Sequence, residues 1–182
     1  MKAMIRGCCL AGLLVLAAPV IARTWRVDAM RSTLAFTALC QGARTEGRFG
    51  RFTADVAYDP RDVARSRFAV RVDVASLDTG NAQRDQATLG ARALDAGRFP
   101  RAYFTTTELR AVGGEVTALG ELKLRGVVRP VVLQVRFVPR GAAATLEVTA
   151  RLSPRDFGVD CGPVQPADGA TVHARLLLDP VP

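Results

Sequence analysis

The chain has 182 residues, of which 49% are hydrophobic and 23% are charged, and its formal net charge is +8 at neutral pH. This length is enough for one domain that buries a sizeable core or encloses a cavity. The basic residues are spread along the chain and not clustered, which argues against a nucleic-acid-binding protein. A transient contact with anionic membrane surfaces remains open.

The amino-terminal segment has the pattern of a secretory signal peptide. Two basic residues precede an apolar run from Cys8 to Ala18 that is too short to span a bilayer, and small residues before Arg23 fit a cleavage site. We therefore expect residues 1–22 to be removed and residues 23–182 to form one mature domain. That domain is expected in the periplasm or outside the cell.

Eight segments of the expected mature domain alternate apolar and polar residues with a period of two, as half-buried β-strands do. The first of them bends around Asp28–Ser32. The sequence predicts hairpin turns at Gly113-Gly114, at Arg125-Gly126 and at Pro139-Arg140-Gly141. The eight segments are residues 25–38, 52–58, 68–74, 102–109, 115–124, 127–138, 144–152 and 171–178.

The stretch between the third and fourth predicted strands lacks this alternation. Strong helix formers follow turn residues in residues 81–89, which predicts a short helix across one end of the fold. Leu94 and Phe99, followed by Pro100, predict an irregular loop that folds back over apolar side chains. Closure removes the exposed edges of a meander. We therefore predict an all-β fold, a closed antiparallel eight-stranded lipocalin-like β-barrel with one short helix near a barrel mouth.

No group of residues in the sequence points to catalysis or to metal binding. There is no Gly-x-Ser-x-Gly nucleophile motif and no Cys-x-x-Cys or Cys/His grouping. His173 is out of phase with the apolar residues around it, so it is expected to face solvent. We expect neither catalytic residues nor a metal site.

Cys40 and Cys161 are the two cysteines of the expected mature domain. An even number of cysteines in an oxidising compartment favours a disulfide, which would tie the loop around residues 155–158 to the first strand. Two separate buried thiols are the alternative.

Motifs spread over nearly the whole expected domain match those of a known family in order and spacing. They are Trp25 with Asp28, Ser32 and Phe36; Gly47-Arg48-Phe49 with Phe52; Tyr58-Asp59; Ser76-Leu77-Asp78-Thr79-Gly80 followed by Arg84-Asp85; Phe99-Pro100 with Phe104; the Gly120–Val131 hairpin; and Arg155-Asp156-Phe157-Gly158. In these motifs the chain resembles the YceI-like family of periplasmic lipid-binding proteins. The resemblance implies a lipocalin-like barrel that binds polyisoprenoids or related long-chain lipids. No cofactor is expected other than such a bound isoprenoid or other lipid.

Two departures from the family pattern bear on the ligand. Cys40 stands where members commonly have a histidine, and Ala93-Leu94 stands where they often have two aromatic residues. The ligand of this chain therefore need not be the best-known ligand of the family.

The resemblance and the alternation together predict the binding residues. Arg84 and Arg155 are candidates for contacting a headgroup, because a guanidinium donates paired hydrogen bonds to phosphate. A salt bridge to the neighbouring aspartate is the alternative for each. The candidates for the apolar cavity are Phe36, Phe52, Leu94, Phe99, Phe104, Leu122, Leu124, Leu133, Val135 and Phe137.

The alternation predicts the barrel, and the resemblance implies that the protein is a non-enzymatic lipid-binding protein. It would sequester or carry a long apolar small molecule, such as a polyisoprenoid, an isoprenoid quinone or a fatty-acyl lipid, in the barrel interior. The alternative is a non-catalytic stress-response or accessory protein that has a filled barrel and acts through its surface.

Overall fold

Eleven β-strands form one sheet that closes on itself in the computed structural model, which describes residues 23–40, 42–160 and 169–181. The strands are β1 (Thr24–Val27), β2 (Thr33–Cys40), β3 (Ala43–Phe49), β4 (Phe52–Ala57), β5 (Arg67–Asp73), β6 (Leu77–Asp78), β7 (Arg101–Val112), β8 (Glu115–Leu124), β9 (Val127–Arg140), β10 (Ala143–Leu152) and β11 (Gly169–Pro180). The helices are α1 (Ala82–Leu89) and the single 3-10 turns η1 (Val63–Arg65), η2 (Val74–Ser76) and η3 (Pro154–Phe157).

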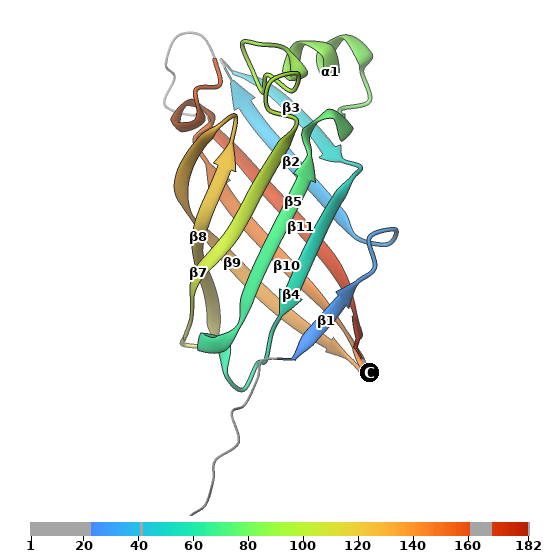
Figure 1. Cartoon of the computed structure of the whole chain (residues 1–182), viewed down its shortest axis with the longest axis vertical. Helices are drawn as coiled ribbons and strands as arrows, with labels where there is room; N and C mark the ends of the chain where they lie inside the picture. Colours follow the sequence, from blue (N-terminus) through green and yellow to red (C-terminus); the bar gives the residue numbers. More distant parts are fainter. Residues whose placement is uncertain (1–22, 41, 161–168, 182) are drawn as a thin grey trace, which may run out of the picture.

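The strands form a closed antiparallel barrel. β1 pairs with β4 on one side and with β11 on the other, which joins the two ends of the sheet. β2 continues β1 along the same edge of β11, β3 runs into β4, and η2 joins β5 to β6. Counted as continuous bent strands, eight surround the interior in chain order (Figure 1). The predicted eight-stranded antiparallel barrel is confirmed.

The predicted bend in the first strand lies between β1 and β2. The Ser32 hydroxyl donates to the Asp28 carbonyl oxygen at 2.6 Å and accepts a hydrogen bond from the Leu177 backbone N–H at 3.0 Å. The Asp28 N–H donates to the Leu177 carbonyl oxygen at 2.9 Å. A serine hydroxyl therefore replaces the ladder bonds that the bend interrupts, so the backbone groups there keep partners.

Two local predictions were wrong. Residues 43–49 belong to none of the eight predicted segments, but they form β3, which pairs with β2 through backbone hydrogen bonds. Pro139 and Arg140 were assigned to a hairpin turn, but they lie inside β9, where Pro139 is opposite Ala144, and the turn falls on Gly141 and the residue after it.

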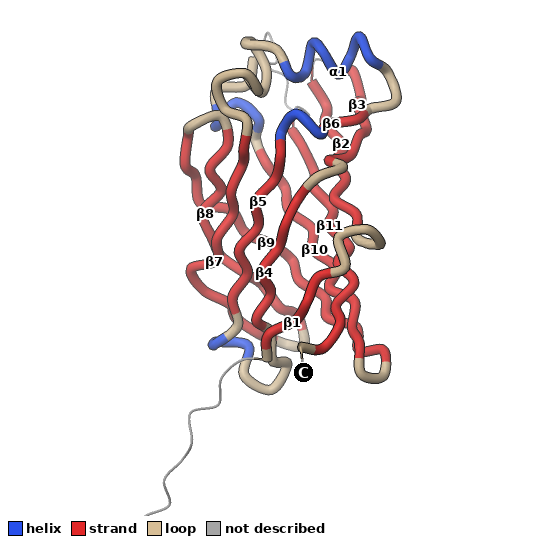
Figure 2. The backbone as a smooth tube through the Cα atoms, turned by 45° about the vertical axis from the view of Figure 1, so that its right-hand side comes forward, coloured by secondary structure: helices blue, strands red, loops and turns tan. Residues whose placement is uncertain are grey.

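One end of the barrel, which we call the mouth, carries α1, the loop of residues 90–100 and η3 (Figure 2). The predicted helix is present, and the Asn81 side chain caps it by accepting a hydrogen bond from the Arg84 N–H at 2.9 Å. No helix among the described residues is long and apolar enough to cross a membrane. The opposite end, which we call the floor, carries β1, the β7–β8 and β9–β10 hairpins and the end of β11 (Figure 1).

The interior is apolar because inward and outward residues alternate along each strand. On β9, Val131, Leu133 and Val135 are buried, whereas Val132 and Gln134 between them are exposed. Most buried residues of the chain belong to one cluster inside the barrel. The part of this interior that is not filled by side chains is the candidate functional site.

Candidate functional site

Aromatic side chains fill the floor of the barrel. The Trp25 indole N–H donates to the Tyr58 carbonyl oxygen at 3.0 Å. The centroid of the Phe137 ring lies 5.5 Å from that of Trp25 and 4.7 Å from that of Tyr58. Phe68 packs against Tyr58 on the inner side, with 6.1 Å between ring centroids. Burial raises the pKa of the Tyr58 hydroxyl, and the nearby charge of Asp59 adds to this, so the tyrosine remains neutral and this aromatic floor carries no charge.

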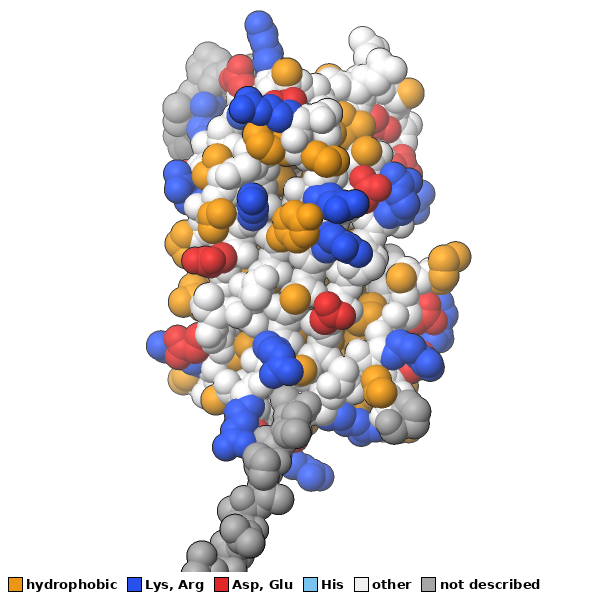
Figure 3. Space-filling view, in the orientation of Figure 1, with side chains coloured by type: hydrophobic (Ala, Val, Ile, Leu, Met, Phe, Trp, Pro, Cys, Tyr) orange, Lys and Arg blue, Asp and Glu red, His pale blue; other side chains and the backbone are white. Residues whose placement is uncertain are grey.

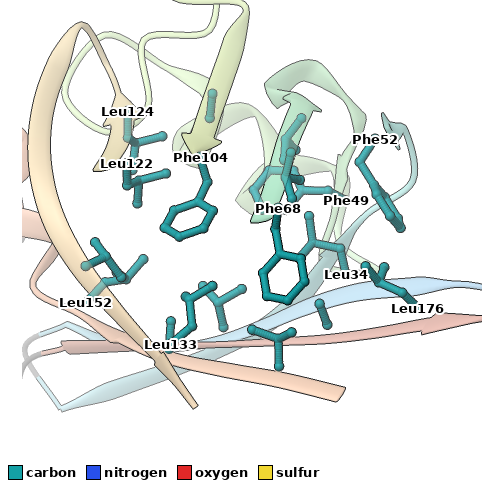
Figure 4. A pocket seen from close by; sticks show the side chains of 18 of the residues that line it. Leu34, Phe49, Phe52, Phe68, Phe104, Leu122, Leu124, Leu133, Leu152 and Leu176 are labelled. Atoms are coloured by element: carbon teal, nitrogen blue, oxygen red, sulfur yellow. The ribbon is translucent and has the colours of Figure 1, made fainter. Parts of the chain in front are cut away.

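Between the floor and the mouth lies a cavity of about 190 Å³ whose 22 lining residues are all apolar. Figure 4 shows side chains from several strands, such as Phe104 of β7, Leu133 of β9 and Leu34 of β2, around the cavity. The lining residues are Leu34, Phe49, Phe52, Val56, Phe68, Val70, Val72, Val74, Leu94, Ala102, Phe104, Leu122, Leu124, Val131, Leu133, Leu146, Val148, Ala150, Leu152, Val172, Ala174 and Leu176.

Gly120 on β8 leaves room for the ring of Phe104, one of the aromatic residues that line the cavity. A β-carbon on Gly120 would lie only 2.5 Å from Cζ of Phe104 and 2.5 Å from the Thr105 carbonyl oxygen. Because Gly120 has no side chain, the Phe104 ring lies over β8 and projects into the cavity (Figure 4). Gly47 on β3 has the same relation to Phe36, since a β-carbon there would be 2.7 Å from Cζ of Phe36.

Six of the ten predicted cavity residues line the cavity, and the other four lie elsewhere. The six are Phe52, Leu94, Phe104, Leu122, Leu124 and Leu133.

The remaining four surround the cavity without lining it. Phe36 packs against Phe49, with ring centroids 5.6 Å apart, and Phe49 is the one that lines the cavity. Phe99 lies over the β8–β9 turn, because a β-carbon on Gly126 would be 2.7 Å from its Cε1. Val135 is buried in the wall, and Phe137 belongs to the floor. The binding role of all ten residues stays a prediction.

Arg125 and one backbone hydrogen bond link the segments of the mouth. Arg125 donates from Nη2 to the Ala91 carbonyl oxygen at 2.6 Å and from Nη1 to the carbonyl oxygen of Gly158. The Asp160 N–H also donates to the Arg92 carbonyl oxygen at 2.8 Å. The β8–β9 turn, the loop of residues 90–100 and the segment around η3 are thereby joined.

The helix itself adds little packing to the mouth. None of the residues of α1 is buried, whereas Leu94, in the loop that follows, reaches the cavity. The turn that leads into α1 is fixed at Asp78, whose carboxylate accepts hydrogen bonds from the Gly80 N–H at 2.8 Å and from Arg48 at 2.9 Å. These bonds, the one from Gly80 first, lower the pKa of Asp78.

The two headgroup candidates lie at the mouth but do not line the cavity. Arg84 is exposed on α1, and Arg155 is half-buried in η3. The suggested pairing of Arg84 with Asp85 is wrong, because the Asp85 carboxylate instead accepts from the Thr79 N–H at 2.9 Å and from its hydroxyl at 2.6 Å. A headgroup role for the two arginines stays a prediction.

Ionisable groups stay outside the cavity. His173 is exposed on the outer face, with Nδ1 3.3 Å from the Thr149 hydroxyl oxygen, as the alternation predicted. Within the described ranges no three or more His, Cys, Asp or Glu side chains group together as metal ligands would. Cys40 ends β2 at the mouth, and Cys161 lies outside the described residues, so the disulfide stays a prediction. The lining itself can exclude water from an apolar guest and offers no acid, base or nucleophile.

The sequence is similar to those of several curated bacterial proteins. A UPF0312 protein of Vibrio cholerae is 35% identical over 121 residues, which cover 63% of this chain and 64% of the relative. One of Enterobacter sp. (strain 638) is 30% identical over 125 residues, 64% of this chain and 65% of the relative. The chain thus matches under two thirds of the length of these curated relatives.

Solved structures extend the likeness over most of the fold. Burkholderia cenocepacia BcnA has a TM-score of 0.77 at 26% identity, covering 84% of this chain and 99% of that one. A polyisoprenoid-binding domain from Saccharophagus degradans, implicated in plant cell wall breakdown, has a TM-score of 0.66 at 16% identity, covering 88% and 99%. The second likeness shows the shared fold alone.

The family model described as the YceI-like domain matches residues 25–177, which is most of the chain and all of the barrel from β1 into β11. The chain therefore belongs to the YceI-like domain family.

Proposed function

We propose that this protein takes up the hydrocarbon tail of a lipid in its barrel and sequesters or carries it without chemical change. The observation that carries the proposal is a cavity with a closed aromatic floor and an entirely apolar lining. Each buried CH₂ group gains about 0.8 kcal/mol on leaving water. A tail needs no polar partner, and the lining offers none.

The cavity volume limits what fits without movement. A cavity of about 150 Å³ in another protein binds benzene, and this one measures about 190 Å³. The closed structure therefore holds the end of a tail and not a whole polyisoprenoid. A longer polyisoprenoid, quinone or fatty-acyl tail must displace the mouth segments, beginning with Leu94.

The shared fold of the polyisoprenoid-binding domain supports a lipid as ligand. The alternative, a filled barrel that acts only through its surface, is less well supported, because well-packed interiors contain few voids larger than a water molecule. The signal-peptide pattern supports an export of the protein to the periplasm or beyond, where an oxidising environment would favour the expected Cys40–Cys161 disulfide. Arg84 and Arg155 remain the candidates for an anionic headgroup at the mouth.

Mass spectrometry of an organic-solvent extract tests this function. The protein is purified from its native compartment, and the extract is expected to contain a long-chain lipid in stoichiometric amount. Delipidated protein should then bind a fluorescent fatty acid and release it to the extracted lipid. An empty extract together with no binding of the fluorescent fatty acid would contradict the proposal.

A further inference from the structure

Exposed apolar side chains gather on one wall of the barrel. Of the seven large apolar residues that stand exposed in the described part of the chain, five belong to β7, β8 and β9. Val112 is at the floor end of β7, and the other four lie on the outer face of the wall. Tyr103 and Leu119 are each 40% exposed, Val128 is 46% exposed and Val132 is 52% exposed. Large apolar side chains exposed singly are normal, whereas a cluster marks an interaction surface.

The strand register places these residues in two rows of one outer face, with the row of Thr105, Glu121 and Pro130 between them. Tyr103 lies opposite Lys123 on β8, which lies opposite Val128 on β9. Leu119 lies opposite Val132 in a row nearer the floor. The row of Tyr103, Lys123 and Val128 is next to the β8–β9 turn, so the surface begins at the mouth. We call this surface the β7–β9 face.

A basic groove borders the β7–β9 face. It measures about 430 Å³ and includes Arg51, Arg71, Asp73 and Arg101 in its lining. Asp73 is paired with Arg51 at 2.8 Å. Met30, which is 94% exposed, stands at the edge of the groove.

Three cations are available for a partner at this surface. Arg71 is opposite Tyr103 in the strand register, Arg101 is two residues before Tyr103, and Lys123 is in its row. None of the three is among the ion pairs within residues 23–40, 42–160 and 169–181. Figure 3 shows hydrophobic side chains flanked by Lys and Arg side chains on the wall that faces the viewer.

We propose that the β7–β9 face docks the barrel on an anionic lipid bilayer. Arg71, Arg101 and Lys123 contact headgroup phosphates, because arginine and lysine supply the charge and hydrogen bonds that phosphate requires. Tyr103 and Val128 enter the headgroup layer, where tyrosine rings are enriched in membrane proteins. The choice of a bilayer over a protein partner rests on the proposed function, since an apolar guest comes from a lipid phase. Docking here brings the mouth to that phase.

Vesicle co-sedimentation tests the docking with the full protein as purified. The wild type should bind phosphatidylcholine vesicles that contain phosphatidylglycerol and not vesicles of phosphatidylcholine alone. Replacing both Arg71→Gln and Lys123→Gln is expected to weaken binding about 25-fold, since each cation at an anionic surface contributes about fivefold. Replacing both Tyr103→Ser and Val128→Ser should weaken the binding that persists in high salt, where charge attraction is screened.

The matched control removes the same charge from another wall. Arg151 and Arg175 are exposed on β10 and β11, outside the β7–β9 face. The double variant Arg151→Gln with Arg175→Gln should retain binding within about twofold of the wild type, because only cations close to the anionic surface contribute to the attraction. Equal weakening by both pairs would assign the attraction to net charge and overturn the proposal, as would binding independent of phosphatidylglycerol.

Fatty-acid binding separates this proposal from the proposed function. The Arg71 and Lys123 pair should bind the fluorescent fatty acid in solution as the wild type does, because neither residue lines the cavity. If the wild type binds the vesicles but no fatty acid, docking stands and the proposed function fails. If the wild type binds fatty acid but no vesicles, docking fails alone.

Discussion

Small residues at inward positions set the size of the cavity. Ala102 on β7 and Ala150 on β10 are buried and line it. Ala150 lies opposite Leu133 on one side and Val172 on the other, and both of these also line the cavity. An alanine between larger neighbours leaves the space that a guest would occupy.

Filling that space should block the guest without harming the fold. We expect Ala150→Leu or Ala102→Leu to weaken fatty-acid binding by at least about tenfold, because the added methylenes occupy room that would hold about two to three CH₂ groups of a tail. The melting temperature should stay the same or rise, since a void is filled. Titration of the fluorescent fatty acid and thermal unfolding measure both effects.

Thr105→Leu is the matched control for Ala102→Leu, because Thr105 is exposed on the outer face of the same strand. It should leave fatty-acid binding unchanged. Unchanged binding in both cavity variants would mean that the fatty acid binds elsewhere.

Trp25 closes the floor by packing and by one hydrogen bond. Trp25→Ala is expected to cost about 3 to 5 kcal/mol, the range for removing a large buried aromatic side chain. Trp25→Phe keeps a ring against Phe137 but leaves the Tyr58 carbonyl oxygen without its donor, which should cost about 1 to 3 kcal/mol. Urea unfolding measures both free-energy changes. It is followed by circular dichroism and not by fluorescence, because both variants lose the single tryptophan of the chain. Equal costs for the two variants would show that the hydrogen bond alone, and not the ring, closes the floor.

Among the elements, the β8–β9 hairpin does more than connect two strands. Arg125 and Gly126 have φ of 51° and 76°, and paired positive φ values characterise the type I′ turn. This conformation costs a non-glycine residue energy. Arg125 adopts this conformation, and its side chain donates hydrogen bonds to the loop of residues 90–100 and to the segment around η3.

Arg125→Asn separates the two roles of the residue. Asparagine followed by glycine suits a type I′ turn, so the hairpin should persist and stability should change by less than about 1 kcal/mol. The contacts to Ala91 and Gly158 are lost, so the mouth should open more often. We expect faster hydrogen exchange of the Asp160 amide, which is bonded to Arg92, and faster release of bound fatty acid.

Arg140→Asn is the control, because Arg140 is exposed beside the β9–β10 turn at the floor. It removes the same charge far from the mouth and should leave exchange and release unchanged. Unaltered release rates in Arg125→Asn would show that ligand exit does not depend on this contact.

For the whole molecule, the barrel could be predicted wherever one face of a strand is buried. The alternation in β5, β8 and β9 follows directly from an apolar interior and a solvated exterior. β3 was missed because Arg44, Glu46 and Arg48 occupy one face and small or polar residues most of the other. Its pairing with β2 is made by the backbone, which leaves no mark on side-chain hydrophobicity.

The sequence could predict which side chains point into the barrel, but not how far along the barrel axis each one lies. Alternation places Leu133, Val135 and Phe137 on the same inward face of β9, yet only Leu133 lines the cavity. The other two lie closer to the floor, where Phe137 meets Trp25, a partner from the other end of the chain. Depth along a barrel axis depends on such long-range contacts, which no local pattern encodes. Leu94 and Phe99 were predicted on the same ground, that a large apolar side chain in a loop requires apolar cover. Leu94 finds that cover in the cavity, whereas Phe99 finds it over Gly126 of the β8–β9 turn.

The disulfide would constrain more of the molecule than any other single bond. Cys40 is at the mouth end of β2, and Cys161 follows Asp160, whose amide is anchored to the loop of residues 90–100. A bridge between them would close a loop that contains every strand from β3 to β10. On the chain-entropy model such a loop stabilises the fold by about 4 to 5 kcal/mol.

Thiol titration of the protein purified from its native compartment tests this bridge. Unfolded in urea without reductant, the protein should show no free thiol, and after reduction it should show two, since Cys8 and Cys9 leave with the expected signal peptide. Cys40→Ser and Cys161→Ser should then lower the free energy of unfolding by similar amounts, because either change opens the same loop, and reduction should have no further effect on either variant. Two thiols that react before reduction would instead establish the separate buried cysteines, and the contacts of the segment around η3 with the mouth would then include those of Arg125 and of the buried Phe157 but no disulfide.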